Sequence, residues 1–228
     1  MKKQILPLTV FALFACCSIS RADITGAWWH DDGDYMIVCN TWNWNPATSA
    51  LSMVGDQHGT PPEPGPGIPA HMLGWITTDT PDDPTLTLGS SIDNDTGGMW
   101  IGYQVNVVMS VPFSFVAPGP SVDNPAPDAA PNDNWFVAGV VAPTLQGAGP
   151  YAGLYEGTLE FSAGTPIGIG DELDFLYSIH FGGATSYAFT QEMIPVFSEV
   201  PEPGMLALAG MGGLMLALRL RRNGRKAA

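Results

Sequence analysis

Consecutive oxygen-bearing side chains mark the first candidate for a metal site in this sequence. Asp93, Asn94 and Asp95 are followed by Thr96-Gly97-Gly98, which makes a polar loop containing glycine. Carboxylate and amide oxygens are the ligands that Ca²⁺ prefers. The loop departs from the EF-hand pattern, because Gly97 stands where a third oxygen ligand belongs and no Glu closes a twelve-residue loop. Two interpretations stay open, a calcium site and a hydrated turn without metal.

A second acidic turn runs from His30 through Asp31, Asp32, Gly33 and Asp34. Asp31, Asp32 and Asp34 supply three carboxylates, which makes this turn another candidate calcium site. A tight, hydrated turn that joins two strands explains the same composition. Metal binding and a simple turn therefore both remain as hypotheses here.

Seven tryptophans offer a different chemistry, the stacking of sugar rings on exposed indoles. Trp28 and Trp29 are neighbours in an extended segment, so their side chains point to opposite faces, whereas Trp42 and Trp44 share a face. Core packing is the usual role of a Trp in a strand. One face that shows indole to solvent would instead make a carbohydrate platform, so a calcium-dependent carbohydrate-binding module is an alternative function.

Catalytic signatures are missing from the sequence. It holds no Gly-x-Ser-x-Gly elbow, His-Glu-x-x-His, Cys-x-x-Cys or phosphate-binding Gly loop. A glycosidase needs two carboxylates in a cleft, one with a raised pKa, but with so many acids some pair always looks suitable. We therefore predict no enzymatic activity and keep a secreted glycosidase-like enzyme as an alternative.

The last residues form three parts in a fixed order. Pro201, Glu202 and Pro203 are followed by an uncharged segment over residues 204–218, and then by a basic tail over residues 219–226 that contains Arg219, Arg221, Arg222, Arg225 and Lys226. The cations resist transfer across a bilayer, so the tail should stay in the cytoplasm and the Pro-Glu-Pro motif should lie on the far side. Met205 to Leu218 would span about 21 Å as a helix, against a hydrocarbon core of about 30 Å. This short span favours a temporary membrane segment over a permanent anchor, which is the alternative.

Residues 200–228 resemble the PEP-CTERM sorting domain of bacterial surface proteins. The resemblance implies that Pro201, Glu202 and Pro203 are recognised by an exosortase, an integral-membrane transpeptidase or protease. It also implies a link to exopolysaccharide and biofilm at the outer surface of the cell. Pro62-Glu63-Pro64 spells the same tripeptide but is followed by Gly65-Pro66-Gly67, without an apolar run or basic cluster. The resemblance says nothing about residues 23–199.

The N-terminal residues 1–22 have the pattern of a signal peptide. Lys2 and Lys3 precede the apolar segment Ile5 to Cys17, and small residues at Ser20 and Ala22 place cleavage between Ala22 and Asp23. Lipidation at Cys16 is an alternative, although Phe14 is bulky for a lipobox. With cleavage at Ala22, Cys39 is the only cysteine left, and it is expected to be a buried, unreactive thiol.

Charge is divided sharply between these ends and the region that they flank. All eight Lys and Arg lie outside Asp23 to Glu199, whereas 21 of the 22 Asp and Glu lie inside it, which gives this region a net charge of −21 with neutral His. Its carboxylates must face water, cap turns or gather cations. Such a region repels nucleic acid and anionic membranes, so no nucleic-acid partner is expected.

Residues 23–199 predict an all-β domain. Met99 to Val111 and Leu173 to Phe181 alternate apolar and polar residues with a period of two, which indicates antiparallel strands with one buried face. In the first of these, Met99, Ile101 and Tyr103 belong to the predicted inward face. Eight further strands are expected at Ile24–Trp29, Tyr35–Trp42, Ala50–Val54, Met72–Thr77, Thr85–Leu88, Trp135–Val141, Leu154–Phe161 and Tyr187–Phe197. About ten strands favour a single antiparallel β-sandwich of jelly-roll type.

Two proline-rich segments interrupt this pattern. Pro61 to Pro69 and Ala117 to Asn134 are expected to be exposed loops. The material on either side of each has the same strand-like character, so one domain is predicted. The preferred function is that of an exported, non-catalytic surface or matrix protein, held briefly in the inner membrane and then released to the outer surface by an exosortase.

Overall fold

A computed structural model describes residues 22–33, 35–59, 71–124 and 135–198. These residues form strands and connecting turns without any helix, and among them no helix is long and apolar enough to cross a membrane. The eleven strands are β1 (Ile24–Asp31), β2 (Ile37–Asn45), β3 (Ala50–Gln57), β4 (His71–Thr78), β5 (Thr85–Asn94), β6 (Trp100–Met109), β7 (Phe113–Asp123), β8 (Phe136–Leu145), β9 (Tyr155–Ile167), β10 (Glu172–Phe181) and β11 (Ser186–Phe197).

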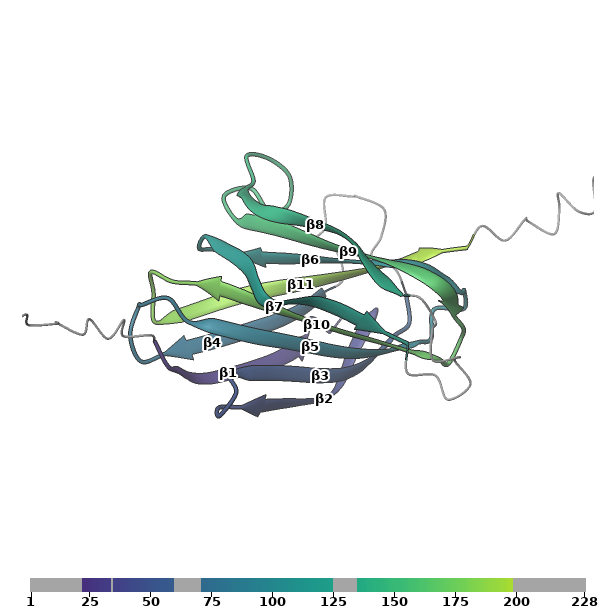
Figure 1. Ribbon diagram of the computed structural model, residues 1–228, viewed down its shortest axis with the longest axis horizontal. Helices are drawn as coiled ribbons and strands as arrows, with labels where there is room; N and C mark the ends of the chain where they lie inside the picture. The colour runs from purple at the N-terminus through teal and green to yellow at the C-terminus, as the bar shows by residue number, and fades with distance from the viewer. Residues whose placement is uncertain (1–21, 34, 60–70, 125–134, 199–228) are drawn as a thin grey trace, which may run out of the picture.

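Two sheets form a β-sandwich, as the sequence predicted (Figure 1). The six-stranded sheet has the order β1-β4-β11-β6-β9-β8, and the five-stranded sheet has the order β2-β3-β5-β10-β7. Apolar side chains from both sheets join in one buried cluster, which includes Trp29, Trp100 and Phe189 from the first and Leu88 and Phe175 from the second. Burial of this apolar surface between the sheets is the main favourable term in folding.

Strand β10 confirms the predicted alternation, whereas β6 departs from it at one end. Leu173, Phe175 and Tyr177 of β10 are each at most 2% exposed. The inward placement predicted for Met99, just before β6, and for Ile101 in β6 is wrong, because both are exposed and Trp100 is buried instead. A register shift against β11 at this point inserts an extra residue into β6. Such a bulge reverses the direction of the side chains that precede it.

One strand pair runs against the antiparallel expectation. Strands β3 and β5 pair in parallel, with Asp56 opposite Asp93 and Gln57 opposite Asn94. The chain leaves β3, forms β4 in the other sheet and returns as β5 beside β3. A crossover of this kind brings the ends of both strands to the same edge of the sandwich.

The loop predicted for Ala117 to Asn134 is wrong over residues 117–123, which belong to β7. This strand lies at the edge of its sheet, where a missing proline N–H is tolerated. Pairing with β10 changes register between Val116 and Ser121, so that Pro118 and Pro120 fall inside an irregular stretch. The proline content therefore indicated an edge strand with a bulge instead of a loop. Residues 125–134 lie outside the described part of the chain.

The described chain begins and ends at opposite ends of the sandwich (Figure 1). At its start, the backbone N–H of Asp23 donates a hydrogen bond to Oδ1 of Asp79 at 2.8 Å, and the N–H of Asp79 donates to the carbonyl of Asp23 at 3.1 Å. At its end, the N–H of Ser198 donates to the carbonyl of Met99 at 3.1 Å. Nearly all of the signal peptide and the whole sorting segment predicted from sequence lie outside the described residues.

Candidate metal centre

The parallel pair β3 and β5 brings together three side chains that can bind a metal ion. Asp56 lies near the end of β3, His58 directly follows this strand, and Asp95 directly follows β5. Backbone hydrogen bonds hold the two ends in place: the N–H of Asp95 donates to the carbonyl of Gln57 at 3.0 Å, and the N–H of His58 donates to that of Met36 at 2.9 Å. The ligating residues therefore stand on well-paired backbone.

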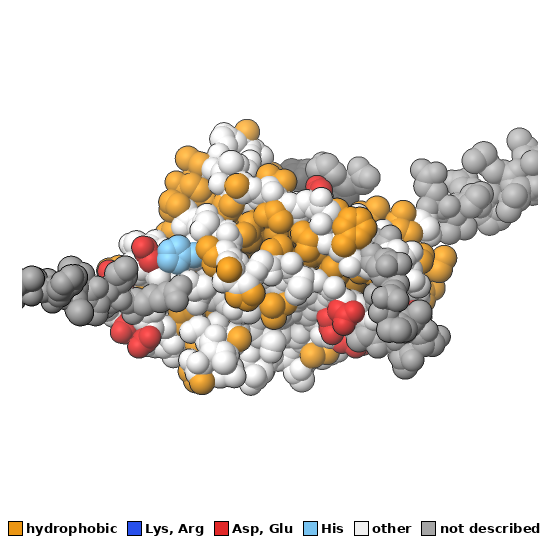
Figure 2. Space-filling model, viewed as in Figure 1, with side chains coloured by type: hydrophobic (Ala, Val, Ile, Leu, Met, Phe, Trp, Pro, Cys, Tyr) orange, Lys and Arg blue, Asp and Glu red, His pale blue; other side chains and the backbone are white. Residues whose placement is uncertain are grey.

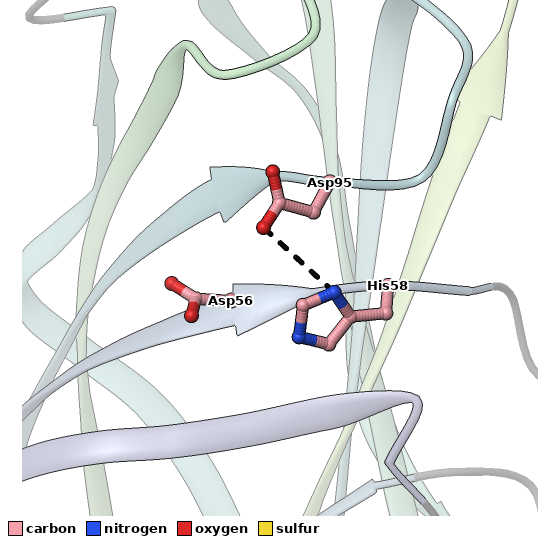
Figure 3. A group of neighbouring side chains, drawn as sticks. All are labelled: Asp56, His58 and Asp95. Carbon is pink, nitrogen blue, oxygen red and sulfur yellow. Dashed lines mark ion pairs between the residues drawn. The ribbon is translucent and has the colours of Figure 1, made fainter.

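Figure 3 shows the three side chains grouped at the ends of these strands. One ligand atom from each of Asp56, His58 and Asp95 lies within 4.8 Å of the others. Nδ1 of His58 is 3.7 Å from Oδ2 of Asp95, and both side chains are nearly half exposed. Nδ2 of Asn40 donates to Oδ1 of Asp56 at 2.9 Å, which orients that carboxylate. We call these three residues the metal centre.

Two buried amide side chains stiffen the backbone beneath the metal centre. Gln57 donates to the carbonyl of Met193 at 3.2 Å and accepts a hydrogen bond from the Tyr103 hydroxyl at 2.5 Å. Asn94 donates to the carbonyls of Gly98 at 2.8 Å and Gly168 at 2.9 Å. Both amides are fully buried, so the alternation along each strand turns the acidic neighbours outward.

This arrangement divides the calcium ligands predicted at Asp93, Asn94 and Asp95. The Asn94 side chain is buried, and its Oδ1 already accepts hydrogen bonds from the backbone N–H and the hydroxyl of Thr96, at 3.1 and 2.7 Å. Asp95 instead joins Asp56 and His58, which sequence reasoning did not connect with it. Asp56 and His58 are two residues apart, but no local spacing could connect them with Asp95, which follows a different strand.

The ligand types favour a borderline transition-metal ion such as Zn²⁺ over Ca²⁺. Zn²⁺ accepts imidazole nitrogen and carboxylate oxygen in a tetrahedral shell at about 2.0 to 2.2 Å, which places neighbouring ligand atoms about 3.4 Å apart. The 3.7 Å between His58 and Asp95 approaches that value. Ca²⁺ takes six to eight oxygens, more than this group provides. Three protein ligands would leave the fourth position open to water or another oxygen ligand.

A row of carboxylates continues from the metal centre across the outer face of the five-stranded sheet. Asp56 on β3 lies opposite Asp93 on β5, which lies opposite Glu172 on β10, and Asp174 of β10 lies opposite Asp123 of β7. Burial and the neighbouring Asp56 raise the pKa of Asp93. Burial and the neighbouring Asp174 raise the pKa of Glu172. We call these five residues the acidic row, and its members repel one another at neutral pH.

A groove with a volume of about 600 Å³ adjoins the acidic row. Small residues of neighbouring strands, Ser52, Gly89, Ser91 and Ser121, line it together with the larger Val54 and Leu176, and with Asp123 and Asp174 from the acidic row. The Ser91 hydroxyl donates to Oδ1 of Asp174 at 2.5 Å.

Acidic side chains gather in patches on an otherwise neutral surface in Figure 2, where no Lys or Arg is seen among the described residues.

The second acidic turn does not form one ligand group among the described residues. Oδ2 of Asp31 accepts a hydrogen bond from the N–H of Cys39 at 3.3 Å, whereas Oδ2 of Asp32 lies 3.7 Å from Nδ1 of His71. The two carboxylates thus turn to different partners, and Asp34 lies outside the described residues.

Burial and the nearby Asp31 raise the pKa of Cys39 to about 11, so this thiol is protonated and unreactive at neutral pH.

A buried polar group lies on the outer face of the six-stranded sheet. Glu192 is 5% exposed and accepts a hydrogen bond from Nδ2 of Asn106 at 2.9 Å. Burial raises the pKa of Glu192, while Asn106, His71 and Tyr151 act against this rise. Burial and the charge of Glu192 also raise the pKa of Glu156. The hydrogen bond between Asn106 and Glu192 links β6 to β11 on this face.

The directions of two pairs of tryptophans agree with their spacing. Trp42 and Trp44 share a face, because they pair with Met53 and Leu51, which are both buried. Trp28 is 37% exposed and Trp29 is 1% exposed, so the neighbours do point to opposite faces. Trp75 and Trp42 are also exposed, at 41% and 48%. Trp44 is half-buried and packs against the core.

No protein-family model, curated protein or solved structure matches this chain.

Proposed function

We propose that this chain is an exported, non-catalytic surface or matrix protein that an exosortase-like membrane enzyme processes near its C-terminus. The observation that carries the proposal is the order of three parts, the motif Pro201-Glu202-Pro203, the apolar residues 204–218 and the basic residues 219–226. The basic tail fixes the orientation of this segment in the inner membrane. Its short apolar part suits temporary retention before release to the outer surface.

The position of the sandwich between the two processing sites supports the proposal. Strand β1 begins at Ile24, one residue after the predicted cleavage point, and β11 ends at Phe197, shortly before Pro201. Cleavage at both sites would therefore leave all eleven strands on one product. That product would contain no Lys or Arg, because all eight lie in the removed segments.

The distribution of charge suits presentation of the motif to a membrane enzyme. Asp95 lies at the same end of the sandwich as the last described residues, because Trp100 pairs with Phe197. Before processing, the acidic metal centre would thus lie on the membrane side. Repulsion between its carboxylates and anionic lipids would hold the sandwich away from the bilayer and keep the short connection to Pro201 accessible.

A cation-dependent binding role is a second candidate function, favoured by the grouping of Asp56, His58 and Asp95. A bound divalent ion would neutralise part of the acidic row and offer its open position to an oxygen ligand. In this role the protein would need a metal cofactor, whereas sorting to the surface needs none.

Mass spectrometry of the native surface protein tests the proposed function. We expect an N-terminus at Asp23 and a C-terminus at or near Pro203, without residues 219–226. Replacement of Glu202 by Gln should leave the basic tail attached and the protein in the inner membrane. The matched control is Glu63→Gln in the internal Pro62-Glu63-Pro64, which should be processed normally because no apolar segment follows it. Recovery of the wild-type product with Arg225 and Lys226 attached would disprove the proposal.

A further inference from the structure

Two exposed indoles lie side by side on the outer face of the six-stranded sheet. Trp28 of β1 is the direct cross-strand partner of Trp75 of β4. Their rings are stacked on one another, with centroids 6.2 Å apart and planes that differ by 23°. Trp29, in contrast, is buried in the core and packs edge-on against Phe189 at 4.7 Å.

Small and hydroxyl-bearing residues lie along one side of this pair, and His30 with Leu73 lies along the other. Ala188 of β11 continues the row directly beside Trp75, and Thr77 with Ser186 forms the neighbouring row. The hydroxyl of Thr25 donates to that of Thr77 at 3.0 Å. On the side of Thr77 and Ser186, a ligand stacked on an indole would therefore meet small side chains and hydroxyl groups.

Exposure of two large apolar side chains together needs an explanation beyond stability. A cross-strand aromatic pair adds only a little to the stability of a sheet. Contiguous exposed apolar surface on a secreted protein is more typical of a binding site. The indole surface that the stacked partner leaves uncovered suits a flat ligand whose surface is apolar and whose edges carry hydroxyls, which describes a pyranose ring.

Charge narrows the identity of the ligand. The sandwich contains no Lys or Arg, so it cannot pair with the carboxylates or sulfates of an acidic polysaccharide. A second copy of the chain is disfavoured as an occupant, because each copy carries a net charge of −21 between Asp23 and Glu199 and the two would repel. Neither the lack of Lys and Arg nor charge repulsion disfavours a neutral polysaccharide.

We propose that Trp28 and Trp75 form a platform that binds neutral hexose units of a polysaccharide. This inference rests on the proposed function, since an exported protein meets such polymers outside the cell. The indoles lie in the six-stranded sheet, whereas the metal centre is formed at the ends of strands in the five-stranded sheet. Binding by the platform is therefore independent of a metal ion, in contrast to the calcium-bridged module considered from the sequence.

Affinity electrophoresis of the native protein tests the platform. Native gels are cast with one of several neutral polysaccharides, a β-1,3-glucan, a β-1,4-glucan, a galactomannan or a starch. At least one should retard the wild-type protein, and the variant Trp28→Ala/Trp75→Ala should lose at least about tenfold in affinity, as expected for paired aromatic anchors. Trp42→Ala, which removes an equally exposed indole from the other sheet, should keep the retardation. Addition of EDTA should change nothing.

Three results of the gel experiment would overturn the platform. They are the absence of retardation by every polymer, equal retardation of wild type and the double variant, and loss of retardation in EDTA. Thermal melting of each variant shows whether it is folded, and protection of Trp fluorescence from acrylamide by the bound polymer gives a second measurement on the wild type alone. Analytical ultracentrifugation would reveal a dimer that depends on Trp28 and Trp75, which would also overturn the proposal. Mass spectrometry of the termini is unaffected by these outcomes, so the platform can fail while the proposed sorting stands.

Discussion

At the residue scale, the metal centre combines two carboxylates and one imidazole, and no Lys or Arg of the described residues neutralises the carboxylates. Asn40 is the hydrogen-bond donor to Asp56, and His58 faces Asp95 at 3.7 Å. Neither contact removes the repulsion between Asp56 and Asp93 that contributes to the raised pKa of Asp93. A divalent ion would remove it, because it brings two positive charges to the oxygens of both strands.

Replacement of one ligand should therefore weaken metal binding. We expect wild-type protein to bind one Zn²⁺ and Asp95→Asn to bind it at least about tenfold more weakly, since loss of a ligand changes both charge and coordination. Isothermal titration calorimetry with ZnCl₂ measures this, and titration with CaCl₂ in parallel should give weaker binding. Asp82→Asn, in an exposed turn, is the matched control. Equal Zn²⁺ affinity for Asp95→Asn and wild type would rule out the centre.

The start of the mature chain provides another residue-scale prediction. Cleavage between Ala22 and Asp23 would convert the amide nitrogen of Asp23, which lies 2.8 Å from Oδ1 of Asp79, into an ammonium group. In the processed product, which would contain no Lys or Arg, this ammonium group would be the main positive charge near neutral pH. Asp79→Asn should lower the melting temperature of the mature protein by a small amount, because surface ion pairs contribute little. The same substitution in a protein that retains Ala22 should have a smaller effect. Scanning calorimetry of both forms makes the comparison, and equal losses would argue against this ion pair.

At the element scale, β4 depends on a glycine beneath an aromatic ring. Strand β4 lies between β1 and β11, and Gly74 pairs with Trp29 on one side and Phe189 on the other. A Cβ at Gly74 would lie 2.0 Å from the Phe189 ring. The absence of a side chain lets Phe189 cover the strand and pack against Trp29, which holds three strands of the sheet together.

Gly74→Ala should consequently destabilise the sandwich by roughly 1 to 3 kcal/mol, the usual cost of overpacking a core. Urea denaturation followed by near-UV circular dichroism measures the free energy of unfolding. Gly119→Ala in β7 is the control, because a Cβ there meets no atom within 4 Å. Unchanged stability of Gly74→Ala would show that Phe189 can leave this position at no cost.

At the scale of the whole molecule, the uncompensated acids determine how stability responds to pH. Burial first, and then neighbouring carboxylates, raise the pKa values of Asp93, Glu156 and Glu172, and burial raises that of Glu192. Each of these groups binds protons more readily in the folded than in the unfolded chain. Their contribution to the free energy of unfolding is therefore full below the ordinary pKa values near 4 and is lost as pH rises through the raised values.

We thus expect the melting temperature to rise as the pH falls from 7 to 5, and also to rise with NaCl at pH 7 because salt screens the repulsion. Glu172→Gln should raise the melting temperature at pH 7 and flatten its pH dependence. Glu160→Gln, an exposed acid on β9, serves as the control and should retain the wild-type slope. Differential scanning fluorimetry from pH 5 to 8 provides the data, and a melting temperature that falls steadily with acidification would contradict the prediction.

Much of the fold was accessible from the sequence because strand patterning is local. The alternation in Leu173 to Phe181 defined its buried face, and turn residues separated ten of the eleven strands. The errors have local causes that only pairing reveals. The bulge that turns Ile101 outward arises from register against β11, and the prolines of β7 are accepted because that strand lies at an edge.

The sequence alone determined the charge partition, the order of the terminal segments and the opposite directions of Trp28 and Trp29, since each follows from residue type and adjacent position. Only the tertiary structure decided which distant residues meet. The parallel pairing of β3 with β5 joins Asp56 and His58 to Asp95, and the pairing of β1 with β4 places Trp28 beside Trp75. Periodicity gives the face on which a side chain lies, but the partner strand and its register come from packing of the whole chain, which no short segment encodes.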